Sequence, residues 1–462
     1  MATPEPIARR LATRVVAWRD GTLPDAVLRR AHELLLDFVG VAVGGAGEAS
    51  SVVLRRGLAA LGLAGTATVI GTGDRLAVPA AACANGAAAH ALEMDDTHQG
   101  GSIHLGASVF PAALAAAELV GATGDAVLRA AVAGYEVGAR LAMALDPAAH
   151  YRRGFHPTGT CGAFAAATAA GLILGLDANA IAAALGIAGS QAAGSMEFLA
   201  DGAWTKRLHP GWAAQAGLHA ASLARAGFVA PATIFEGRFG VLAAYSDAPR
   251  TAPLLADDRF ELLDTAVKPH ACCRYMQGPI DAALALRTEH EIDPAAIETI
   301  DVGVLAAGWA IVCEPEVRKR HPTSVVDLQF SLPFGVAAAL ARGAASPDEF
   351  ALATLDDPDV RSLMDRVRAV RDPALDACFP RAWPAWMRIR LRDGRTLERH
   401  VAQPLGDPEN FLDPDALRAK LRRLAGRTLP PPVVERLVIA ANGVPEAPAM
   451  DALLAATRPP AT

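Results

Sequence analysis

Apolar residues recur at helical spacing in segment after segment across the first 265 or so residues, and alanine is abundant throughout. Leu28, Leu35 and Val39 follow Pro24 with this spacing, and Gly40 is the expected end of their helix. Alanine at this density favours close-packed helices over a sheet. The sequence therefore predicts a mainly helical fold.

Turn and capping residues divide this stretch further. Pro111 is expected to open an alanine-rich helix that closes near Gly121, and Asp125 to cap the next helix. A glycine at position 227 is the expected end of another. The remaining predicted helices span residues 160–175, 178–188 and 212–226.

The pattern changes after residue 266. Ile300, Val302 and Val304 alternate with polar or small residues, and residues 387–391 alternate in the same way before Asp393-Gly394, a strong hairpin signal. Helices are expected between these strands and again after a turn-rich linker. A smaller α/β segment over 267–402 is predicted, with expected helices at 325–342, 347–370, 413–424 and 432–441.

Composition excludes several classes of protein. Hydrophobic residues make up 52% of the 462-residue chain and charged residues 20%, which suits a large core and two to three domains. The net charge is −6 with no basic run, so nucleic acid is not an expected partner. No apolar leader begins the chain, and the most apolar stretch, 162–176, is shorter than a membrane span. Six scattered cysteines suit reduced thiols, and a cytoplasmic location is expected.

Lysine is rare, with only four among the 43 Lys and Arg residues. A lysine that persists where arginine is the rule can mark a site that needs a compact ammonium. Lys206 and Lys268 fall inside the polar clusters described next, whereas Lys319 and Lys420 are assigned to ordinary residue usage.

The first polar cluster lies in otherwise apolar surroundings and runs from Glu93 through Asp96, Thr97 and His98 to His104. Three readings stay open for it: a metal site, a carboxylate that holds a histidine in its catalytic tautomer, or helix caps and surface charge. The contiguous acids and the Gly100-Gly101 loop count against the metal.

Three further clusters carry titratable groups. In residues 151–160, His156 precedes a helix start beside threonine and glycine, where backbone N–H groups favour an anion; a buried structural histidine is the alternative. In 201–212, Lys206, Arg207 and His209 form a cluster of donors that suits carboxylate binding, or else a solvated basic loop. Residues 268–277 fall where the helical region meets the α/β segment, a common place for a site.

Nucleotide-binding and simple hydrolase motifs are absent: there is no GxxxxGK[ST], no GxGxxG after a strand, no GxSxG and no HExxH. The four clusters together, with the runs 184–190, 213–217, 235–237 and 406–408, resemble the MmgE/PrpD family over nearly the whole chain. That family includes 2-methylcitrate dehydratase, cis-aconitate decarboxylase and iminodisuccinate epimerase.

The resemblance implies an all-helical domain built from residues 1–266 and 403–462, an α/β lid domain over 267–402, a homodimer, and a site without metal or cofactor. It implies acid/base and carboxylate-binding roles for Asp96, Thr97, His104, His156 and Lys206. Family members often have Asp at position 93, and some have His in place of Gln277. The segment Phe330-Ser331-Leu332-Pro333-Phe334 has Phe where decarboxylase-like members have a Tyr hydroxyl. The last two departures weaken a decarboxylase reading.

The expected chemistry is removal of a proton from the carbon beside a carboxylate of a small di- or tricarboxylic acid. His104 or His156 is the expected base, because histidine titrates near neutral pH, and Lys206 and Arg274 are expected to stabilise the developing charge. Loss of water, reprotonation from the other face and loss of carbon dioxide are the open outcomes, with a hydro-lyase first, an epimerase second, and a non-catalytic binder as the alternative of another class. The expected catalytic residues are His104, His156, Lys206, Asp96, Tyr151 and Tyr275, and the expected substrate-binding residues are Glu93, Thr97, Arg207, His209, Lys268, His270, Arg274 and Gln277.

Overall fold

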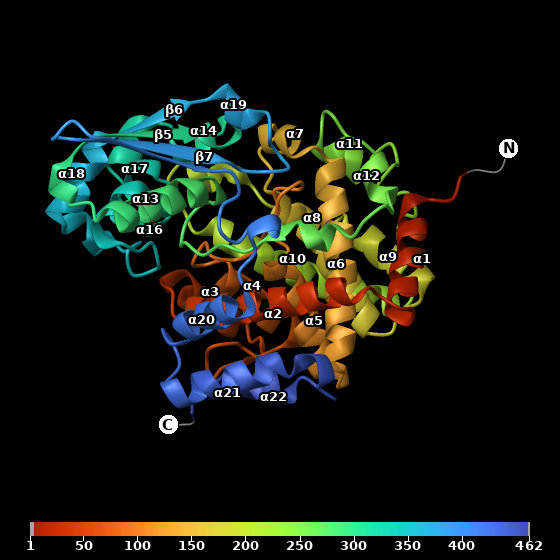
Figure 1. Cartoon of the computed structure of the whole chain (residues 1–462). Coiled ribbons are helices and arrows are strands. Elements are labelled where there is room, and N and C mark those ends of the chain that lie inside the picture. The colour runs from red at the N-terminus through yellow and green to blue at the C-terminus, as the bar shows by residue number, and fades with distance from the viewer. Residues whose placement is uncertain (1–3, 461–462) are drawn as a thin grey trace.

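Helix α8 (Pro157–Ile173) is buried along its whole length and lies inside a bundle of other helices. The computed structural model describes residues 4–460, and α8 contacts α5 (Gly106–Val120), α6 (Gly124–Ala144) and α10 (Thr205–Arg225) in it (Figure 1). A Cβ on Gly217 would lie 2.5 Å from the backbone nitrogen of Ala167, so α8 and α10 approach at a distance that only glycine permits. Small residues thus allow close helix packing, as predicted, and the fold is mainly helical.

The other helices of this part surround that bundle. Helix α2 (Asp25–Gly45) packs on α4 (Val78–Ala89), and α9 (Ala178–Ala188) packs on α10 and on α1 (Ile7–Asp20). Two short strand pairs interrupt the helices, β1 (Ala64–Thr68) with β2 (Arg75–Leu76), and β3 (Thr97–His98) with β4 (Thr265–Ala266). The remaining helices here are α3 (Ala49–Ala60), α7 (Pro147–Arg152), α11 (Val241–Tyr245) and α12 (Ala252–Leu255).

Several predicted helix ends were wrong. Helix α2 continues through Gly40 to Gly45. A Cβ on Gly40 would lie 3.0 Å from Leu421 Cα, so this glycine allows close contact with a neighbouring helix and does not end its own. Helix α5 begins at Gly106, five residues before Pro111. The side chain of Thr123, not of Asp125, caps α6. Helix α10 begins at Thr205, so Lys206 and His209 lie in its first turns and not in a loop before it.

The larger sheet has four strands in the order β6-β5-β7-β8 (Figure 1). The predicted strands are confirmed as β5 (Ile297–Val304), β7 (Ala385–Leu391) and β8 (Thr396–Val401), with the hairpin between the last two. Edge strand β6 (Val367–Arg371) pairs parallel to β5, where the sequence predicted helix up to residue 370. The helices here are α13 (Gln277–His290), α14 (Ala306–Val312), α15 (Glu316–Arg320), α16 (Val325–Gln329), α17 (Leu332–Arg342), α18 (Pro358–Arg366) and α19 (Pro373–Asp376).

Side-chain burial shows how this sheet is covered. Met387, Ile389 and Leu391 are buried, whereas Arg388 and Arg390 between them are exposed, so one face of β7 is apolar and the other faces solvent. Helix α13 packs against β7 and β8, and α17 packs against β6. The predicted single helix over 325–342 is two helices, α16 and α17, because the chain breaks at Phe330-Ser331, where Ser331 caps α17.

The C-terminal helices pack against the N-terminal part of the chain. Helix α20 (Pro414–Ala425), predicted from Asp413, packs on α2, and α21 (Pro431–Asn442) and α22 (Asp451–Ala456) follow beside it (Figure 1). The two-domain division stays a prediction, but the contact between α2 and α20 agrees with a helical part built from both chain ends. No single helix in the described residues has the length and composition of a membrane span; only α2 and α3 combined reach them, across an 82° bend.

Candidate active site

A cavity lies where the helical part meets the segment that carries the larger sheet. The loop after α4, the start of α8, the segment 196–199 and the first turn of α10 line one side, and residues of the α/β segment line the other. The whole lining consists of Glu93, Thr97, Ser102, His104, Tyr151, His156, Met196, Phe198, Leu199, Lys206, Cys273, Arg274, Tyr275, Ile311, Phe330 and Trp383. All four polar clusters of the sequence therefore contribute to a single cavity.

The loop between α4 and α5 carries most of the polar residues, and its backbone is strained at two of them. Glu93 has a φ of 55° and Ser102 a φ of 48°, both in the left-handed region that non-glycine residues rarely adopt. Pairing of Thr97 with Ala266 between β3 and β4 holds the loop in place. Strain of this kind clusters at functional sites, where the surrounding structure imposes it.

Two lysines and two carboxylates form a buried network at the base of the cavity. Lys206 Nζ donates to Glu93 Oε1, and Lys268 Nζ lies 3.5 Å from Glu93 Oε2 and 3.4 Å from Asp95 Oδ1. Burial alone would raise the pKa of Glu93, but Lys206 and Lys268 outweigh it and lower that pKa. The same lysine pairing keeps both acids ionised, so the network holds two ammonium groups beside the cavity without net charge.

Two imidazoles face the cavity as neutral bases. His104 Nδ1 lies 2.8 Å from the Asp96 carbonyl oxygen, which can only accept, so Nδ1 carries the proton and Nε2 a free electron pair. His156 Nδ1 lies 3.0 Å from His209 Nδ1, which again leaves the Nε2 atom of His156 unbonded to that partner. Burial holds the pKa of both His104 and His156 well below the ordinary value. Both are therefore ready to accept a proton at neutral pH.

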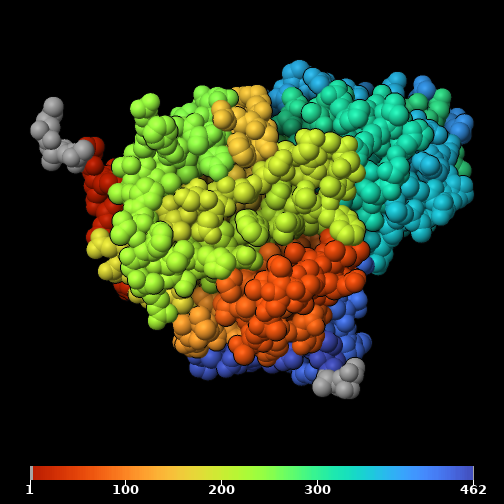
Figure 2. Space-filling view, turned by 180° about the vertical axis from the view of Figure 1, so that it is seen from behind, coloured from red at the N-terminus to blue at the C-terminus, as the bar shows by residue number. Residues whose placement is uncertain are grey.

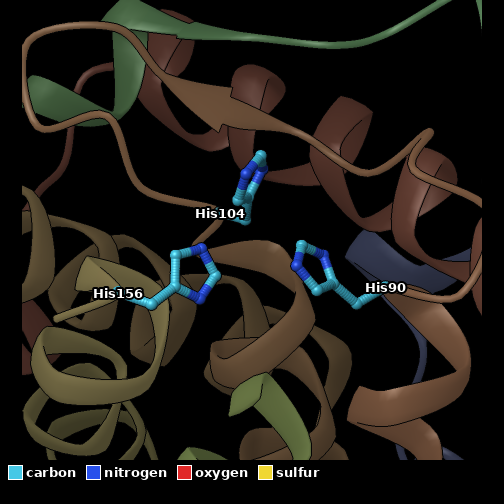
Figure 3. Close-up of side chains that lie close together, drawn as sticks. All are labelled: His90, His104 and His156. Atoms are coloured by element: carbon cyan, nitrogen blue, oxygen red, sulfur yellow. The ribbon is translucent and has the colours of Figure 1, made fainter. Parts of the chain in front are cut away.

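A third histidine, His90, was not singled out from the sequence. It follows the last residue of α4, is fully buried, and its Nδ1 lies 2.6 Å from Asp95 Oδ2. Figure 3 shows His90, His104 and His156 facing one common space from three different segments. In the sequence, the only indication of its role is an aspartate, Asp95, five residues after the histidine.

Two tyrosines and a serine also line the cavity. The Tyr151 hydroxyl is 3.1 Å from Ser102 Oγ, and burial raises its pKa to about 12, so it stays protonated and can donate. The ring of Tyr275 stacks on Trp383, with their centroids 4.4 Å apart. Lys206 Nζ lies 5.2 Å from the centre of the Phe330 ring. The cavity thus combines an apolar wall with a small number of polar groups, as sites for small ligands do.

Six of the predicted site residues lie outside the lining. The Asp96 carboxylate accepts from the Tyr135 hydroxyl at 2.5 Å and from the Gly106 amide, and burial raises its pKa to about 7. His209 contacts His156 through their Nδ1 atoms, and Lys268 Nζ lies 3.5 Å from Glu93 Oε2. Three more bond to neighbouring protein groups: Arg207 to Ser50 and Gln329, His270 to Asp281, and Gln277 to the carbonyl oxygens of His270 and Cys272.

Arg274 lines the cavity but is not a free cation, because it pairs with the buried Asp407. Burial also lowers its pKa to about 10. Lys206 also pairs with a buried acid, but Glu93 has Lys268 as a second partner, so Lys206 is better placed than Arg274 to meet a substrate carboxylate. The apolar lining residues Met196, Phe198, Leu199, Ile311 and Trp383 were not predicted, since isolated apolar residues carry no sequence signal that separates a cavity wall from a core.

Lys319 and Lys420, to which the sequence analysis gave no special role, are buried like the other two lysines. Lys420 Nζ lies 2.5 Å from Asp37 Oδ1 and 2.8 Å from the Met94 carbonyl oxygen. All four lysines of the chain therefore occupy buried positions, which extends the pattern inferred from their scarcity.

Two groups of side chains have the spacing of metal ligands. Ligand nitrogens of His90, His104 and His156 lie within 4.8 Å of one another, as do ligand atoms of His98, Glu261 and Asp264. The first group is adjacent to Lys206 and Lys268, whose positive charges oppose a cation, and to Glu93 and Asp95, whose negative charges favour one. The second is adjacent to Arg140 and Arg259, which bond to the same acids. Both donor sets fit a metal ion in number, and the absence of a resident metal stays a prediction.

Two family models match the chain, the MmgE/PrpD N-terminal domain over residues 9–253 and the MmgE/PrpD C-terminal domain over residues 270–443. The chain belongs to the MmgE/PrpD family. Among characterised relatives, it is 29% identical to cis-aconitate decarboxylase-like protein oryM of Aspergillus oryzae, with 94% of each chain covered. It is 28% identical to cis-aconitate decarboxylase of Aspergillus terreus, over 87% of this chain and 86% of the relative, and 27% identical to that of Homo sapiens, over 94% and 90%.

Proposed function

We propose that this chain is an enzyme that moves a proton on or off the carbon beside a carboxylate of a small di- or tricarboxylic acid, without a cofactor. The observation that carries the proposal is the meeting of His104, His156 and Lys206 in one cavity between two parts of the chain. Neutral imidazoles provide the base, and a buried ammonium provides charge for the carboxylate that becomes an enediolate. Membership of the MmgE/PrpD family supports the same class of substrate.

Substrate binding uses the cation of Lys206 and the amphipathic wall of the cavity. A substrate carboxylate near Lys206 Nζ competes with Glu93 for that ammonium. Lys268 continues to balance the negative charge of Glu93. Lys206 is thereby free to strengthen its bond to the substrate as negative charge grows during proton removal. Stabilisation that increases in the transition state accelerates the chemical step.

The first candidate reaction is loss of water from a hydroxy acid. His104 or His156 takes the proton beside the carboxylate, and Tyr151, which keeps its phenolic proton, gives a proton to the departing hydroxyl. These groups line the same cavity, so an acid and a base can act on adjacent carbons of one substrate.

The second candidate is decarboxylation, because the relatives named above are cis-aconitate decarboxylases or are named after them. Loss of carbon dioxide leaves negative charge on carbon, which a histidine must then protonate, so the same imidazole acts as acid instead of base. Phe330 counts against this candidate, since its ring brings no proton donor to the cavity. Epimerisation of an imino- or amino-diacid remains a third outcome of the same proton removal.

The test is proton NMR in heavy water with citrate, 2-methylcitrate, cis-aconitate and iminodisuccinate as a panel. New vinyl signals together with growth of enoate absorbance identify dehydration, release of carbon dioxide identifies decarboxylation, and exchange of the α-hydrogen alone identifies epimerisation. The His104→Asn and His156→Asn variants should each reduce the rate by about 10²–10⁴-fold if that histidine transfers the proton. Full activity in both variants, or no reaction with any acid of the panel, contradicts the proposal.

A further inference from the structure

His90 lies behind the two histidines of the cavity and makes no part of its lining. It is fully buried, and its ring centre is 4.9 Å from that of His104 and 6.0 Å from that of His156. Ligand nitrogens of the three rings lie within 4.8 Å of one another. A proton on either of the two cavity histidines is therefore close to His90 (Figure 3).

The bonding partners of His90 define which nitrogen carries its proton. Nδ1 lies 2.6 Å from Asp95 Oδ2, and Asp95 is a buried carboxylate whose other oxygen faces Lys268 at 3.4 Å. Burial alone would raise the pKa of Asp95, but His90 and Lys268 outweigh it and hold that pKa well below the ordinary value. An ionised carboxylate can only accept, so Nδ1 of His90 must donate.

The second nitrogen of His90, Nε2, then has a lone pair that accepts no hydrogen bond within the described part of the chain. Nε2 is buried and has no hydrogen-bond partner among residues 4–460. Buried polar atoms without partners are uncommon, and each calls for a functional or structural reason. His104 and His156 lie near it, with ring centres 4.9 Å and 6.0 Å from that of His90.

We propose that His90 is a positioning residue of the reaction, one that accepts from its Nε2 side the proton that His104 or His156 removes from the substrate. In that step the N–H bond of the cavity histidine breaks and a bond to His90 Nε2 forms. His90 then carries protons on both nitrogens, Asp95 remains a carboxylate, and the cavity histidine returns to its neutral form. The reverse transfer returns the proton for the acid step. This inference rests on the proposed function, since it assigns the fate of the same proton.

Groups on every side of His90 fit this role. Asp95 stabilises its protonated form, whereas Lys206 and burial oppose it, and burial is the largest effect, so the pKa of His90 lies below the ordinary value and the resting ring is neutral. A neutral acceptor beside a protonated base is what a proton-sharing pair requires. A histidine with a merely structural role would instead be expected to bond through both nitrogens, as His150 does to Tyr245 and Thr160.

The test is the His90→Asn variant, because the asparagine amide can still donate to Asp95 but cannot take up a proton. We expect kcat to fall by about 10²-fold with KM within about twofold, and the acidic limb of the pH profile to move to higher pH, since His90 lowers the pKa of both His104 and His156 in the parent enzyme. His150→Asn is the matched control, a buried histidine outside the cavity lining, and should change neither. Thermal unfolding of both variants separates loss of fold from loss of rate.

A second measurement does not depend on activity. In resting protein with ¹⁵N-labelled histidine, we expect the His90 signals, identified by their absence in His90→Asn, to show a neutral ring protonated at Nδ1. We expect the cavity histidines to titrate at higher pH in the variant, because His90 lowers their pKa. A proton at Nε2 of His90, or unchanged titration of the cavity histidines, overturns the inference. So does a kcat within about threefold of the parent enzyme. If the parent enzyme acts on no acid of the panel, the proposed function fails and the labelled-histidine titration still decides the role of His90.

Discussion

Lys420 Nζ donates to the carbonyl oxygen of Met94 at 2.8 Å, so a helix near the C-terminus holds the loop that carries Glu93 and Asp95. The same ammonium lies 2.5 Å from Asp37 of α2 and is buried with it. Lys420 thus joins three segments that lie far apart in sequence, and it does so from outside the cavity.

The first prediction follows from this bond. Replacing Lys420 with Met should lower the free energy of unfolding by about 3–5 kcal/mol, because Asp37 is left as an uncompensated buried acid. The double variant Asp37→Leu, Lys420→Met should recover most of that stability, since an apolar pair replaces the ion pair. Its activity should stay reduced, because Met94 has lost its anchor. Urea unfolding and turnover measure the two effects, and full activity in the double variant would contradict a positioning role.

The second prediction concerns the ammonium in the cavity. Lys206→Met should reduce kcat/KM by about 10²–10³-fold, the usual loss when a charge-stabilising donor is removed. Lys206→Arg should not restore activity, because a planar guanidinium does not fit where a compact ammonium lies between Glu93 and the Phe330 ring. Lys319→Arg is the comparison, a buried lysine that donates to the Ile311 carbonyl. Activity in Lys206→Arg near that of the parent would show that charge alone is needed.

The third prediction separates the two tyrosines of the cavity. Tyr151→Phe removes a hydroxyl that burial keeps protonated, and turnover should fall by about 10–100-fold if that hydroxyl is the acid. Tyr275→Phe should cost less, because its ring stacks on Trp383 whether or not the hydroxyl is present. Steady-state rates with the substrate found in the panel decide between them. Equal losses in the two variants would reject Tyr151 as the only acid.

The fourth prediction concerns pH and stability. His90, His104, His156 and His209 are held neutral by burial, so each takes up a proton on unfolding below about pH 6.5, and stability should fall as the pH falls from 7 to 4. Asp96 acts in the opposite sense, because its pKa is raised from 3.8 to about 7 and the folded protein binds its proton first as the pH falls.

Asp96→Asn removes that opposing effect and should steepen the loss of stability between pH 7 and pH 4, by up to about 1.4 kcal/mol per pH unit. Urea unfolding at several pH values measures the slope for the variant and its parent. A shallower slope in the variant would mean that the pKa of Asp96 in the folded protein lies below its ordinary value of 3.8 and not above it.

A fifth prediction tests the expected absence of a metal. Dialysis against a chelator should leave turnover unchanged, whereas added Zn²⁺ should inhibit by occupying the free nitrogens of His104 and His156. Metal analysis of the purified protein supplies the control. Loss of activity on dialysis, with recovery on adding one metal ion, would replace the proton-transfer scheme with metal-assisted chemistry.

Much of the fold could be predicted because local signals agree with the tertiary structure. Helix α9 begins after Asp177, whose side chain accepts from the Ala180 amide, and the hairpin after β7 follows from Asp393-Gly394. Strand β6 was missed because its five residues follow α18 directly and carry no alternation of their own. The start of α10 was misplaced because Pro210 suggests a helix boundary, yet it lies inside the helix.

Part of the candidate site could also be predicted from the sequence, and part could not. Titratable residues that gather within a short run, such as Glu93 to His104, were predicted and do line the cavity in part. Lys420 could not be placed from sequence, because its partner Asp37 is 383 residues away. His90 was missed because it ends an alanine-rich segment and lies three residues before the polar cluster that begins at Glu93. Pairing between distant segments is decided by packing, which one sequence does not display.

The pairing of α2 with α20 has a consequence for biosynthesis. A ribosome finishes α2, with its buried acid Asp37, long before it reaches the lysine that neutralises it. Until residue 420 has left the exit tunnel, the nascent chain carries a carboxyl group without the lysine that pairs with it, and Met94 lacks the bond to that lysine. We therefore expect chains released before residue 420 to be less stable than the full chain.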